Sequence, residues 1–484
     1  MLAAKLYPKE DVGIATALLS RFDPIFDKFP SNPLNGIGII WRETFIYSLP
    51  INNRIKMITR DTWIEVIRDF QERGLPELVE RELEVDLKLP INRATIIMGP
   101  RRCGKTYYCF QLIKKLRRKN RYPLYVNLED NRLSGATVGD LERMLAIYYE
   151  MYPSEKEFYV FLDEVQSVPH WEGFVRRLLD DNVRVFITGS SSKLLSKEIA
   201  SAMRGRSLSY IMLPFSFTEY LASKGIKVRR YMSLKEKSRL LNMLHEYLEW
   251  GGYPECILYP KGREKILKEI IDITIFRDVV ERYGVKNIRV LRLLINALIN
   301  SPEFSIHRFY NFLKSMGVKI SKNTLYTYSE CLEDIFFVFF LRRFSTSYRE
   351  IEQTRPKVYL VDNGLLRING ISETRLLENL VFLELYRRCE STKKLFYYKT
   401  SDGKEVDFVI CGEGVKQLIQ VCYDISDYKT KERELKSLVR AAKELNCNNL
   451  LVITWDYEAK EEFKGREIKF TPLWRWLLKD DRKN

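Results

Sequence analysis

At 484 residues the chain is too long for one ordinary domain, and its 45% hydrophobic content is that of a globular protein with sizeable cores. Lys and Arg number 80 against 64 Asp and Glu, and the surplus of +16 favours an acidic partner such as nucleic acid, or else reflects a heavily charged surface of the thermophilic kind. The eight Cys form no C-x-x-C pair and the longest apolar run, 335–341, is too short to cross a bilayer, which argues against zinc ribbons, thioredoxin motifs and membrane helices.

Residues 1–56 carry few functional signals. The opening stretch MLAAKLYPKED meets charge too early for a signal peptide, and scattered Cys in a large chain are typical of a reducing compartment. We therefore expect a cytoplasmic protein with no membrane partner. The stretch GIGIIWRETFIYSLP, at 36–50, predicts a pair of strands.

A phosphate-binding loop follows the first predicted strand, Thr95–Met98. Residues 99–106 match G-x-x-x-x-G-K-T, and an amphipathic helical stretch comes next, so the strand, loop and helix that this motif requires are all predicted. Lys105 would reach the β- and γ-phosphates of ATP, and the hydroxyl of Thr106 would hold Mg²⁺. The residues expected to contact the nucleotide are Gly99, Pro100, Arg101, Arg102, Cys103, Gly104, Lys105, Thr106 and Tyr107.

A later stretch, EFYVFLDEVQSV at 157–168, contains an apolar run that is followed directly by an acidic pair, Asp163 and Glu164. In a nucleotide hydrolase such a strand end holds a carboxylate linked to Mg²⁺, and we assign that role to Asp163. The next carboxylate, Glu164, would orient and deprotonate the attacking water.

The remaining strands complete a parallel sheet of the α/β class. They are predicted at 122–130, 183–192 and 208–213, with helical segments between them. Thr188 and Ser190 fall at a carboxyl strand end, where ligands bind in such sheets, so one of them either senses the γ-phosphate or belongs to a plain Ser/Thr turn.

At this point the motifs GPRRCGKT, FLDEVQ, ITGSSSKLL, RGRS, LPFSFTEYL and WGGYPE have occurred in order. This series resembles the AAA+ ATPases of archaea and bacteria that carry a C-terminal nuclease-like domain. The resemblance runs from about residue 57 to the end. It implies a P-loop ATPase core (57–217), a helical lid (218–285), a winged helix-turn-helix (286–368) and a restriction-endonuclease-like α/β domain (369–484). Residues 1–56 are then a small separate domain or a mis-assigned start, since Met57-Ile58-Thr59 reads like the start of related chains.

The same resemblance implies an arginine finger in MRGRS, at 203–207, with Arg206 the first choice and Arg204 the second. Such an arginine comes from a neighbouring subunit and neutralises charge as the γ-phosphate leaves, so self-association, in a hexamer-like ring or another oligomer, is expected. The alternative is a basic patch that contacts solvent or DNA.

Three helical patterns, Val290–Asn300, Ser305–Met316 and Ser321–Asp334, precede two strand-like runs at 336–344 and 357–361. Ser305 and Ser321 are candidate N-caps. Helices followed by a hairpin indicate a winged helix, which contacts either DNA or protein. The side chains suited to DNA are Lys322, Asn323, Thr324, Tyr326 and Thr327.

The last domain carries a damaged metal-nuclease pattern. By resemblance, Glu378 matches the helical acid and Asp407 the metal-binding aspartate, while the final strand LIQVCYDI has Gln420 and Cys422 in place of an acid and a lysine. Gln420 can still offer a carbonyl oxygen to a metal, but a thiol cannot replace a permanent ammonium. We therefore expect an inactive nuclease-like domain, unless a migrated lysine rescues it. The candidates are Lys399, Lys404 and Lys416.

These observations predict an ATP- and Mg²⁺-dependent AAA+ ATPase that couples hydrolysis to DNA binding or remodelling. The first alternative is a nucleotide-gated switch, in which ATP only sets the conformation of a protein or DNA complex. The second is an ATP-dependent nuclease, which the missing lysine disfavours.

Overall fold

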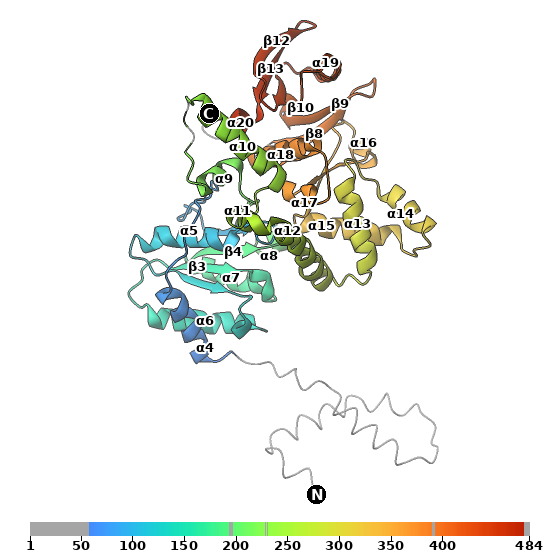
Figure 1. The fold of residues 1–484 in the computed structure, drawn as a ribbon. Coiled ribbons are helices and arrows are strands. Elements are labelled where there is room, and N and C mark those ends of the chain that lie inside the picture. Colours follow the sequence, from blue (N-terminus) through green and yellow to red (C-terminus); the bar gives the residue numbers. More distant parts are fainter. Residues whose placement is uncertain (1–57, 193–196, 228, 230, 390–392, 479–484) are drawn as a thin grey trace, which may run out of the picture. The chain divides into compact units, whose positions relative to one another are not determined.

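The computed structural model describes residues 58–478 apart from 193–196, 228, 230 and 390–392 (Figure 1). The chain divides into two compact units, Met1–Lys56 and Met57–Asn484. The first unit lies outside the described residues, and so does the strand pair predicted at 36–50. All the elements below belong to the second unit, and none of the described helices is long and apolar enough to cross a membrane.

Five parallel strands form the first sheet, in the order β2-β3-β4-β1-β5. Their bounds are Ala94–Met98 (β1), Leu124–Asn127 (β2), Tyr159–Asp163 (β3), Arg184–Gly189 (β4) and Ser207–Ile211 (β5). All five predicted strands are confirmed, although β2 is shorter than the apolar run 122–130. β1 and β3 are buried along their whole length, as expected of inner strands covered by helices on both faces.

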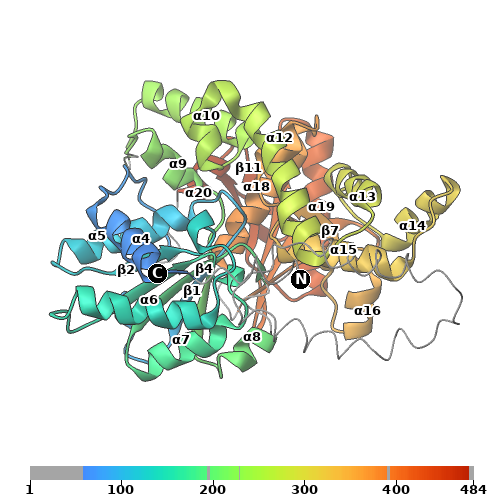
Figure 2. The ribbon, with the colours of Figure 1, turned by 90° about the horizontal axis from the view of Figure 1, so that it is seen from below.

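Helices cover both faces of this sheet (Figures 1 and 2). Ile97, Phe161 and Phe186 pack with the apolar side of α5 (Lys105–Arg117). Alternate residues of the same strands point the other way, into the core shared with α6 (Val138–Met151) and α7 (Trp171–Asp180). The loop before α5 lies at the carboxyl edge of the sheet because it directly follows the end of β1. The remaining elements of this region are α4 (Arg60–Glu72), η3 (Asn131–Leu133), η4 (Val165–Ser167) and α8 (Lys197–Ala202).

Residues 217–281 are mainly helical, as predicted. The elements are α9 (Phe217–Ser223), α10 (Leu234–Trp250), α11 (Pro254–Leu258), η6 (Pro260–Gly262), α12 (Arg263–Ile273) and η7 (Thr274–Glu281). The turn after α10 needs glycine, because Gly251 has φ +73° and a Cβ there would lie 1.8 Å from Asp362 Oδ1. η7 continues α12 as a π-helix, a form that is rare and concentrated at functional sites.

The next segment contains the three predicted helices and a strand pair. The elements are α13 (Ile288–Asn300), α14 (Ile306–Ser315), α15 (Lys322–Asp334), β6 (Val338–Leu341), α16 (Tyr348–Gln353), β7 (Lys357–Leu360) and α17 (Asn363–Arg367). Ser305 and Ser321 cap α14 and α15, and their side chains accept hydrogen bonds from the Arg308 and Thr324 amides. β6 and β7 pair antiparallel. The short helix α16 between them is an element that we did not predict.

A second sheet, of six strands, forms the C-terminal part in the order β12-β13-β11-β10-β9-β8. The elements are α18 (Glu373–Arg388), β8 (Lys394–Lys399), β9 (Glu405–Gly412), β10 (Gly414–Cys422), α19 (Tyr428–Glu444), β11 (Leu450–Thr454), β12 (Ala459–Phe463), β13 (Arg466–Pro472) and α20 (Leu473–Leu477). β10 is parallel to β11 and antiparallel to β9, so the sheet is mixed.

α10 lies beside elements that occur much later in the chain. It packs against α17, α18 and α20, and Lys237 Nζ at its start is 2.9 Å from Asp456 Oδ2. Figure 1 shows α10 next to α18 and α20. A continuous apolar core runs through the parallel sheet, the helices of residues 217–281 and the C-terminal sheet.

Candidate active site

The phosphate loop connects the carboxyl end of β1 to the first turn of α5. Gly99 cannot be replaced without a shift of the backbone, because a Cβ there would lie 1.9 Å from the Met212 carbonyl oxygen. Gly104 has φ +101°, which glycine adopts readily, and it precedes α5 without a side chain to cap the helix. The N–H groups of the first turn and the positive end of the helix dipole are therefore suited to an anion such as a phosphate.

Lys105 lies at the centre of this loop and is 4% exposed. Its Nζ donates to the carbonyl oxygens of Gly99 (3.0 Å) and Pro100 (3.1 Å) and lies 3.6 Å from Glu164 Oε1. Burial alone would lower the pKa of Lys105, but Glu164, Cys103 and Asp163 together outweigh this and raise it. The side chain remains a buried cation that could bind phosphate oxygens.

Asp163 and Thr106 meet as the sequence predicts for a Mg²⁺ site. The Thr106 hydroxyl donates to Asp163 Oδ2 over 2.7 Å, and Tyr125 donates to the same oxygen over 2.8 Å. Burial raises the pKa of Asp163, and hydrogen bonds from Thr188, Thr106 and Tyr125 oppose that shift. A hydroxyl and a carboxylate at this edge are oxygen ligands of the kind that Mg²⁺ takes beside a phosphate, so the residues fit the ion.

Glu164 occupies a left-handed backbone conformation, with φ +54°, directly after β3. Its amide donates to Thr188 Oγ1 over 3.0 Å, while the Thr188 hydroxyl donates to Asp163. Burial alone would raise the pKa of Glu164, but Lys105, a hydrogen bond from Gln166 and two arginines lower it. An ionised Glu164 is in the state that a base for water activation needs.

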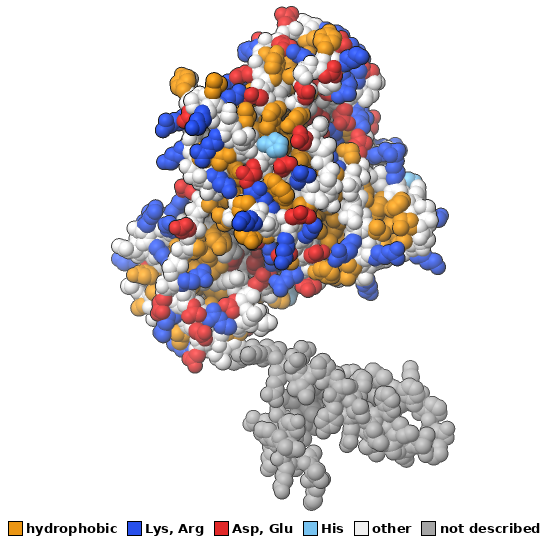
Figure 3. Space-filling view, in the orientation of Figure 1, with side chains coloured by type: hydrophobic (Ala, Val, Ile, Leu, Met, Phe, Trp, Pro, Cys, Tyr) orange, Lys and Arg blue, Asp and Glu red, His pale blue; other side chains and the backbone are white. Residues whose placement is uncertain are grey.

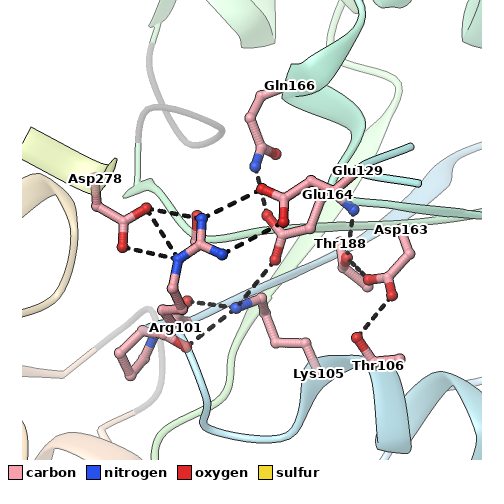
Figure 4. A network of polar contacts seen from close by, with 12 residues as sticks. Arg101, Lys105, Thr106, Glu129, Asp163, Glu164, Gln166, Thr188 and Asp278 are labelled. Atoms are coloured by element: carbon pink, nitrogen blue, oxygen red, sulfur yellow. Dashed lines mark hydrogen bonds and ion pairs between the residues drawn. The ribbon is translucent and has the colours of Figure 1, made fainter. Parts of the chain in front are cut away.

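Arg101 joins the phosphate loop to η7 (Figure 4). Its Nε is 3.0 Å from Asp278 Oδ2, and its Nη2 is 3.3 Å from Glu129 Oε1 at the end of β2. Four residues after Asp278, Arg282 donates through Nη2 to Ser190 Oγ over 2.9 Å. Three of these residues were not predicted as site residues: Asp278, Arg282 and Glu129. For Asp278 and Arg282 the available signal was the charged stretch RDVVER at 277–282.

A pocket of about 390 Å³ lies where these groups meet. Its lining residues come from the loop, the ends of β2 and β3, and η7 with the residue that follows it. They are Arg101, Glu129, Gln166, Ser167, Arg277, Glu281 and Arg282. The pocket thus adjoins the phosphate loop and has both acidic and basic side chains in its lining.

The other predicted loop residues have varied surroundings. Arg102 Nη1 is 2.8 Å from Glu255 Oε2. Cys103 is buried, and its carbonyl accepts a 2.8 Å hydrogen bond from Arg81. Tyr107 is 55% exposed on α5.

Arg206 lies at the opposite edge of the sheet from the phosphate loop. Its carbonyl accepts a 3.0 Å hydrogen bond from Ala94 at the start of β1, whereas the loop follows the end of β1. The Arg206 guanidinium is paired with Asp180, at the end of α7. Arg204 is exposed and has φ +51°. The structure therefore brings neither arginine to the nucleotide site of its own chain.

In the C-terminal part, Glu378 and Asp407 are brought together by a lysine that we did not predict. Lys357 Nζ lies 2.8 Å from Glu378 Oε1 and 3.0 Å from Asp407 Oδ1. Lys357 is the first residue of β7. It lies outside residues 369–484, the segment that contains all three candidates for a migrated lysine. A lysine opening a predicted hairpin strand is too common to have been a signal.

The remaining residues of the nuclease pattern have other partners. Gln420 donates through Nε2 to Glu434 on α19 over 2.6 Å, and its Oε1 lies 3.4 Å from the Asp407 amide. The Cys422 thiol donates to the Asp424 carbonyl over 3.2 Å, and burial raises its pKa to about 11. Of the three candidate lysines, Lys399 pairs with Glu303 and lies 3.6 Å from Glu405 Oε2, Lys404 pairs with Asp402, and Lys416 is exposed.

Comparison with known families agrees with the loop and the parallel sheet. Residues 91–221 match the family described as AAA domain, and two domains of unknown function match residues 241–375 (DUF8612) and 373–476 (DUF4143). The chain therefore contains the P-loop core of the AAA+ ATPases.

Relatives match most of the chain. The Uncharacterized protein MJ1544 of Methanocaldococcus jannaschii is 38% identical over 453 residues, which cover 91% of this chain and 95% of that protein. An uncharacterized protein of Haemophilus influenzae is 29% identical over 394 residues, which cover 78% of this chain and 93% of that protein. The chain belongs to the same family as MJ1544.

Two solved structures are similar to parts of the chain. Cdc6p from Pyrobaculum aerophilum has 13% identity and a TM-score of 0.23, and the match covers 60% of this chain and 88% of that one. AMPPCP-bound DnaA from Aquifex aeolicus has 15% identity and a TM-score of 0.23, with 56% and 86% covered. At these TM-scores neither structure adds to the assignment.

Proposed function

We propose that this chain hydrolyses ATP with Mg²⁺ and couples hydrolysis to the binding or remodelling of DNA. The observation that carries the proposal is the meeting of two pairs at one edge of the parallel sheet. Lys105 Nζ lies 3.6 Å from Glu164 Oε1, and Thr106 Oγ1 lies 2.7 Å from Asp163 Oδ2. A cation for phosphate, two oxygen ligands for a metal and an ionised carboxylate for water are the groups that phosphoanhydride hydrolysis requires.

Each residue has a role in this proposal. Lys105 and the amides of the loop bind the phosphates, while Thr106 and Asp163 hold Mg²⁺, which neutralises charge on the phosphate oxygens. Glu164 takes the proton of the attacking water. Ser190, bonded to Arg282, reports the presence of the γ-phosphate, and Thr188 orients Asp163 and the Glu164 amide.

Residues 218–285 act as the lid in this proposal. The pocket of about 390 Å³ is lined by Arg101 and Gln166 on one side and by Arg277, Glu281 and Arg282 on the other. Arg282 is a cation that could reach a phosphate from the lid side, because it already lies 2.9 Å from Ser190.

DNA is the proposed partner of the winged helix at 286–368. Lys322, Asn323, Tyr326 and Thr327 are exposed on α15, and Tyr326 is 52% exposed. Lys and Arg side chains also lie around an apolar area over α13 and α14 in Figure 3. Phosphates would be met by the basic side chains and base faces by the exposed tyrosine.

Self-assembly completes the catalytic site in this proposal. Arg206 lies at the far edge of the sheet from its own phosphate loop, where a neighbouring subunit could receive it. Arg204 is the second choice. The domain at 369–484 has a nuclease-like arrangement without cleavage activity, and it contributes a scaffold for nucleic acid.

The experiment is a steady-state ATPase assay without DNA and with single-stranded, duplex and branched DNA. Lys105→Ala should abolish turnover, whereas Glu164→Gln should bind ATP but barely hydrolyse it, since an amide cannot accept the water's proton. Glu150→Gln is a matched control on an exposed surface pair. Turnover near the wild-type rate in Glu164→Gln would contradict the assignment.

A nucleotide-gated switch is the second candidate, and one observation favours it. Asp334 at the end of α15 is bonded to Ser191 and Ser192 directly after β4, so the state of the nucleotide site could be passed on without repeated hydrolysis. Single turnover with no stimulation by any DNA form, together with nucleotide-dependent binding, would favour the switch over the ATPase.

A further inference from the structure

Lys357 occupies the centre of a group of three carboxylates. Its Nζ lies 2.8 Å from Glu378 Oε1 on α18, and 2.6 Å and 3.0 Å from Glu405 Oε1 and Asp407 Oδ1 on β9. The Lys357 side chain is only 6% exposed. The ammonium donates hydrogen bonds to Glu378 and Asp407 and forms an ion pair with Glu405.

Groups other than Lys357 also donate hydrogen bonds to these carboxylates. Tyr359 donates to Glu378 Oε1 over 2.7 Å, and the Val421 amide donates to Asp407 Oδ2 over 2.9 Å. Three carboxylate oxygens within 3.0 Å of Nζ favour the charged ammonium at the centre of the group.

A nuclease-like domain would be expected to hold Mg²⁺ on Glu378 and Asp407, but the residues do not fit such an ion. Mg²⁺ requires about six oxygen ligands at about 2.0–2.1 Å in octahedral geometry. Among the described residues, no three His, Cys, Asp or Glu side chains are arranged to hold a metal. The space between Glu378 and Asp407 is taken by the ammonium, and the Gln420 amide is bonded to Glu434.

The poor fit of these residues to Mg²⁺ is not due to a lack of access from solvent. A pocket of about 320 Å³ adjoins the group and is lined by Lys357, Glu378 and Glu405 together with Arg308 and Arg355. An ion from solvent could therefore reach two of the carboxylates. It would have to displace an ammonium that is attached to the chain and is thus always present.

We propose that Lys357 is the resident cation of this group and takes the place of a divalent metal ion. The ammonium then has a second effect, because it links two parts of the fold. β7 pairs with β6, whereas the carboxylates lie on α18 and β9 of the C-terminal part. The cluster fixes the hairpin to the C-terminal sheet. A neighbouring backbone link supports this anchoring, since the Phe344 amide, just after β6, donates to the Tyr397 carbonyl of β8 over 2.7 Å.

The first test uses the folded wild-type protein and Asp407→Asn, with Mn²⁺ titrated in the absence of nucleotide and free Mn²⁺ followed by electron paramagnetic resonance. The two proteins should bind the same number of ions, because the wild-type group has no vacancy for Mn²⁺. The loss of one bound ion in Asp407→Asn would overturn the proposal. So would cleavage of DNA by the wild type, in Mg²⁺ or Mn²⁺, that Asp407→Asn abolishes.

The second test removes the ammonium with Lys357→Met, and Lys404→Met is the control because Lys404 pairs with Asp402 outside the group. Lys357→Met should lose roughly 5–10 °C in Tm, because buried carboxylates are left unpaired. It should gain one Mn²⁺ site, and Mn²⁺ should restore part of the lost Tm. Adding Asp407→Asn to Lys357→Met should remove that site. A folded Lys357→Met that binds no additional Mn²⁺ would overturn the proposal, and if the variant does not fold, the first test decides.

Discussion

The carboxylate of Asp334 accepts a 2.9 Å hydrogen bond from the hydroxyl of Ser191. Asp334 is the last residue of α15, and Ser191 follows β4 by two residues. The same carboxylate accepts a 2.6 Å bond from Ser192. The end of a helix with exposed basic and aromatic side chains is thus bonded to the strand end beside the nucleotide site, and this contact can be tested for coupling.

Asp334→Asn should weaken the coupling between nucleotide and DNA while leaving each ligand's own affinity nearly unchanged. Asp334 accepts from Ser192 on Oδ1 and from Ser191 and Tyr283 on Oδ2, and an amide keeps only one acceptor oxygen, so the hydroxyls on the other side lose their acceptor. Coupling factors between sites are commonly about 5- to 150-fold, and the factor should fall towards 1. It is measured as the ratio of DNA Kd values with and without a non-hydrolysable ATP analogue. Glu330→Gln, one turn earlier on α15, is the control, and an unchanged ratio in Asp334→Asn would show that the contact is only structural.

Asp278→Asn should tighten ATP binding by about 3- to 10-fold, a change of about 1 kcal/mol. The reason is competition, because Arg101 in the phosphate loop is held by Asp278 and Glu129 and must exchange a carboxylate for a phosphate. The measurement is ATP affinity by calorimetry in the hydrolysis-deficient Glu164→Gln background. Asp272→Asn, which changes an exposed ion pair with Arg292, is the control. Weaker binding in Asp278→Asn would mean that Asp278 holds Arg101 in its binding position.

Arg206→Ala should reduce ATP turnover by about 10³-fold or more while leaving ATP affinity nearly intact, if Arg206 acts in a neighbouring subunit. Mixing Arg206→Ala with Lys105→Ala subunits should then recover part of the activity, since some interfaces combine an intact loop with an intact arginine. Arg177→Ala, which removes an exposed pair with Glu142 on the same side of the sheet, is the control. Full activity in a protein that light scattering shows to be monomeric would contradict the role of Arg206.

Lys322→Ala should weaken DNA binding to a similar extent for many sequences and flatten its salt dependence. One phosphate contact contributes about 0.9 to the slope of log K against log salt, so the slope should decrease by about that amount. Fluorescence anisotropy between low and moderate salt measures both quantities. Lys460→Ala, on exposed β12, is the control, as the Lys460 side chain is 66% exposed. An affinity that does not depend on salt would favour a protein partner for residues 286–368, the proposed winged helix.

Asp362→Asn should remove part of the pH dependence of stability. Burial raises the pKa of Asp362 to about 7, although the Gly252 and Gly364 amides donate to its two oxygens. A carboxyl whose pKa is higher in the folded state contributes stability that is complete below its unfolded pKa of about 3.9 and is lost as the pH rises through about 7. The Tm difference between wild type and variant, measured from pH 4 to pH 8, should therefore shift against the wild type as pH rises. A constant difference would show that Asp362 stays in one charge state.

The strands and the nucleotide loop were predictable because local sequence determines them. Thr95–Met98 and Phe158–Leu162 are apolar runs that end at glycine or aspartate, and Ser305 and Ser321 mark the beginnings of helices through their own hydroxyls. Such signals lie within a few residues of the structure that they specify. Lys105, Thr106 and Asp163 came from the same local patterns.

The partners of other site residues, Arg101 and Asp407, were not predictable, because they come from distant parts of the chain. Asp278 lies 177 residues after Arg101, and its contact depends on the continuation of α12 as a π-helix. Lys357 reaches Asp407 from another strand pair, 50 residues away. A charged residue in an apolar pattern is usually a solvated one, so only the packing of the chain distinguishes these residues.

The packing of α10 against α17, α18 and α20 has a consequence for synthesis on the ribosome. α10 ends at Trp250, but the helices that cover it end only at Leu477. During translation at about 5–20 residues per second, the buried side chains of α10 would therefore lack the last of these partners, α20, for roughly ten to forty-five seconds. The packing around α10 is complete only after α20 has emerged. Chaperones that bind apolar segments would be expected to act on the nascent chain in this interval, and a premature stop before α20 would leave the same surface exposed permanently.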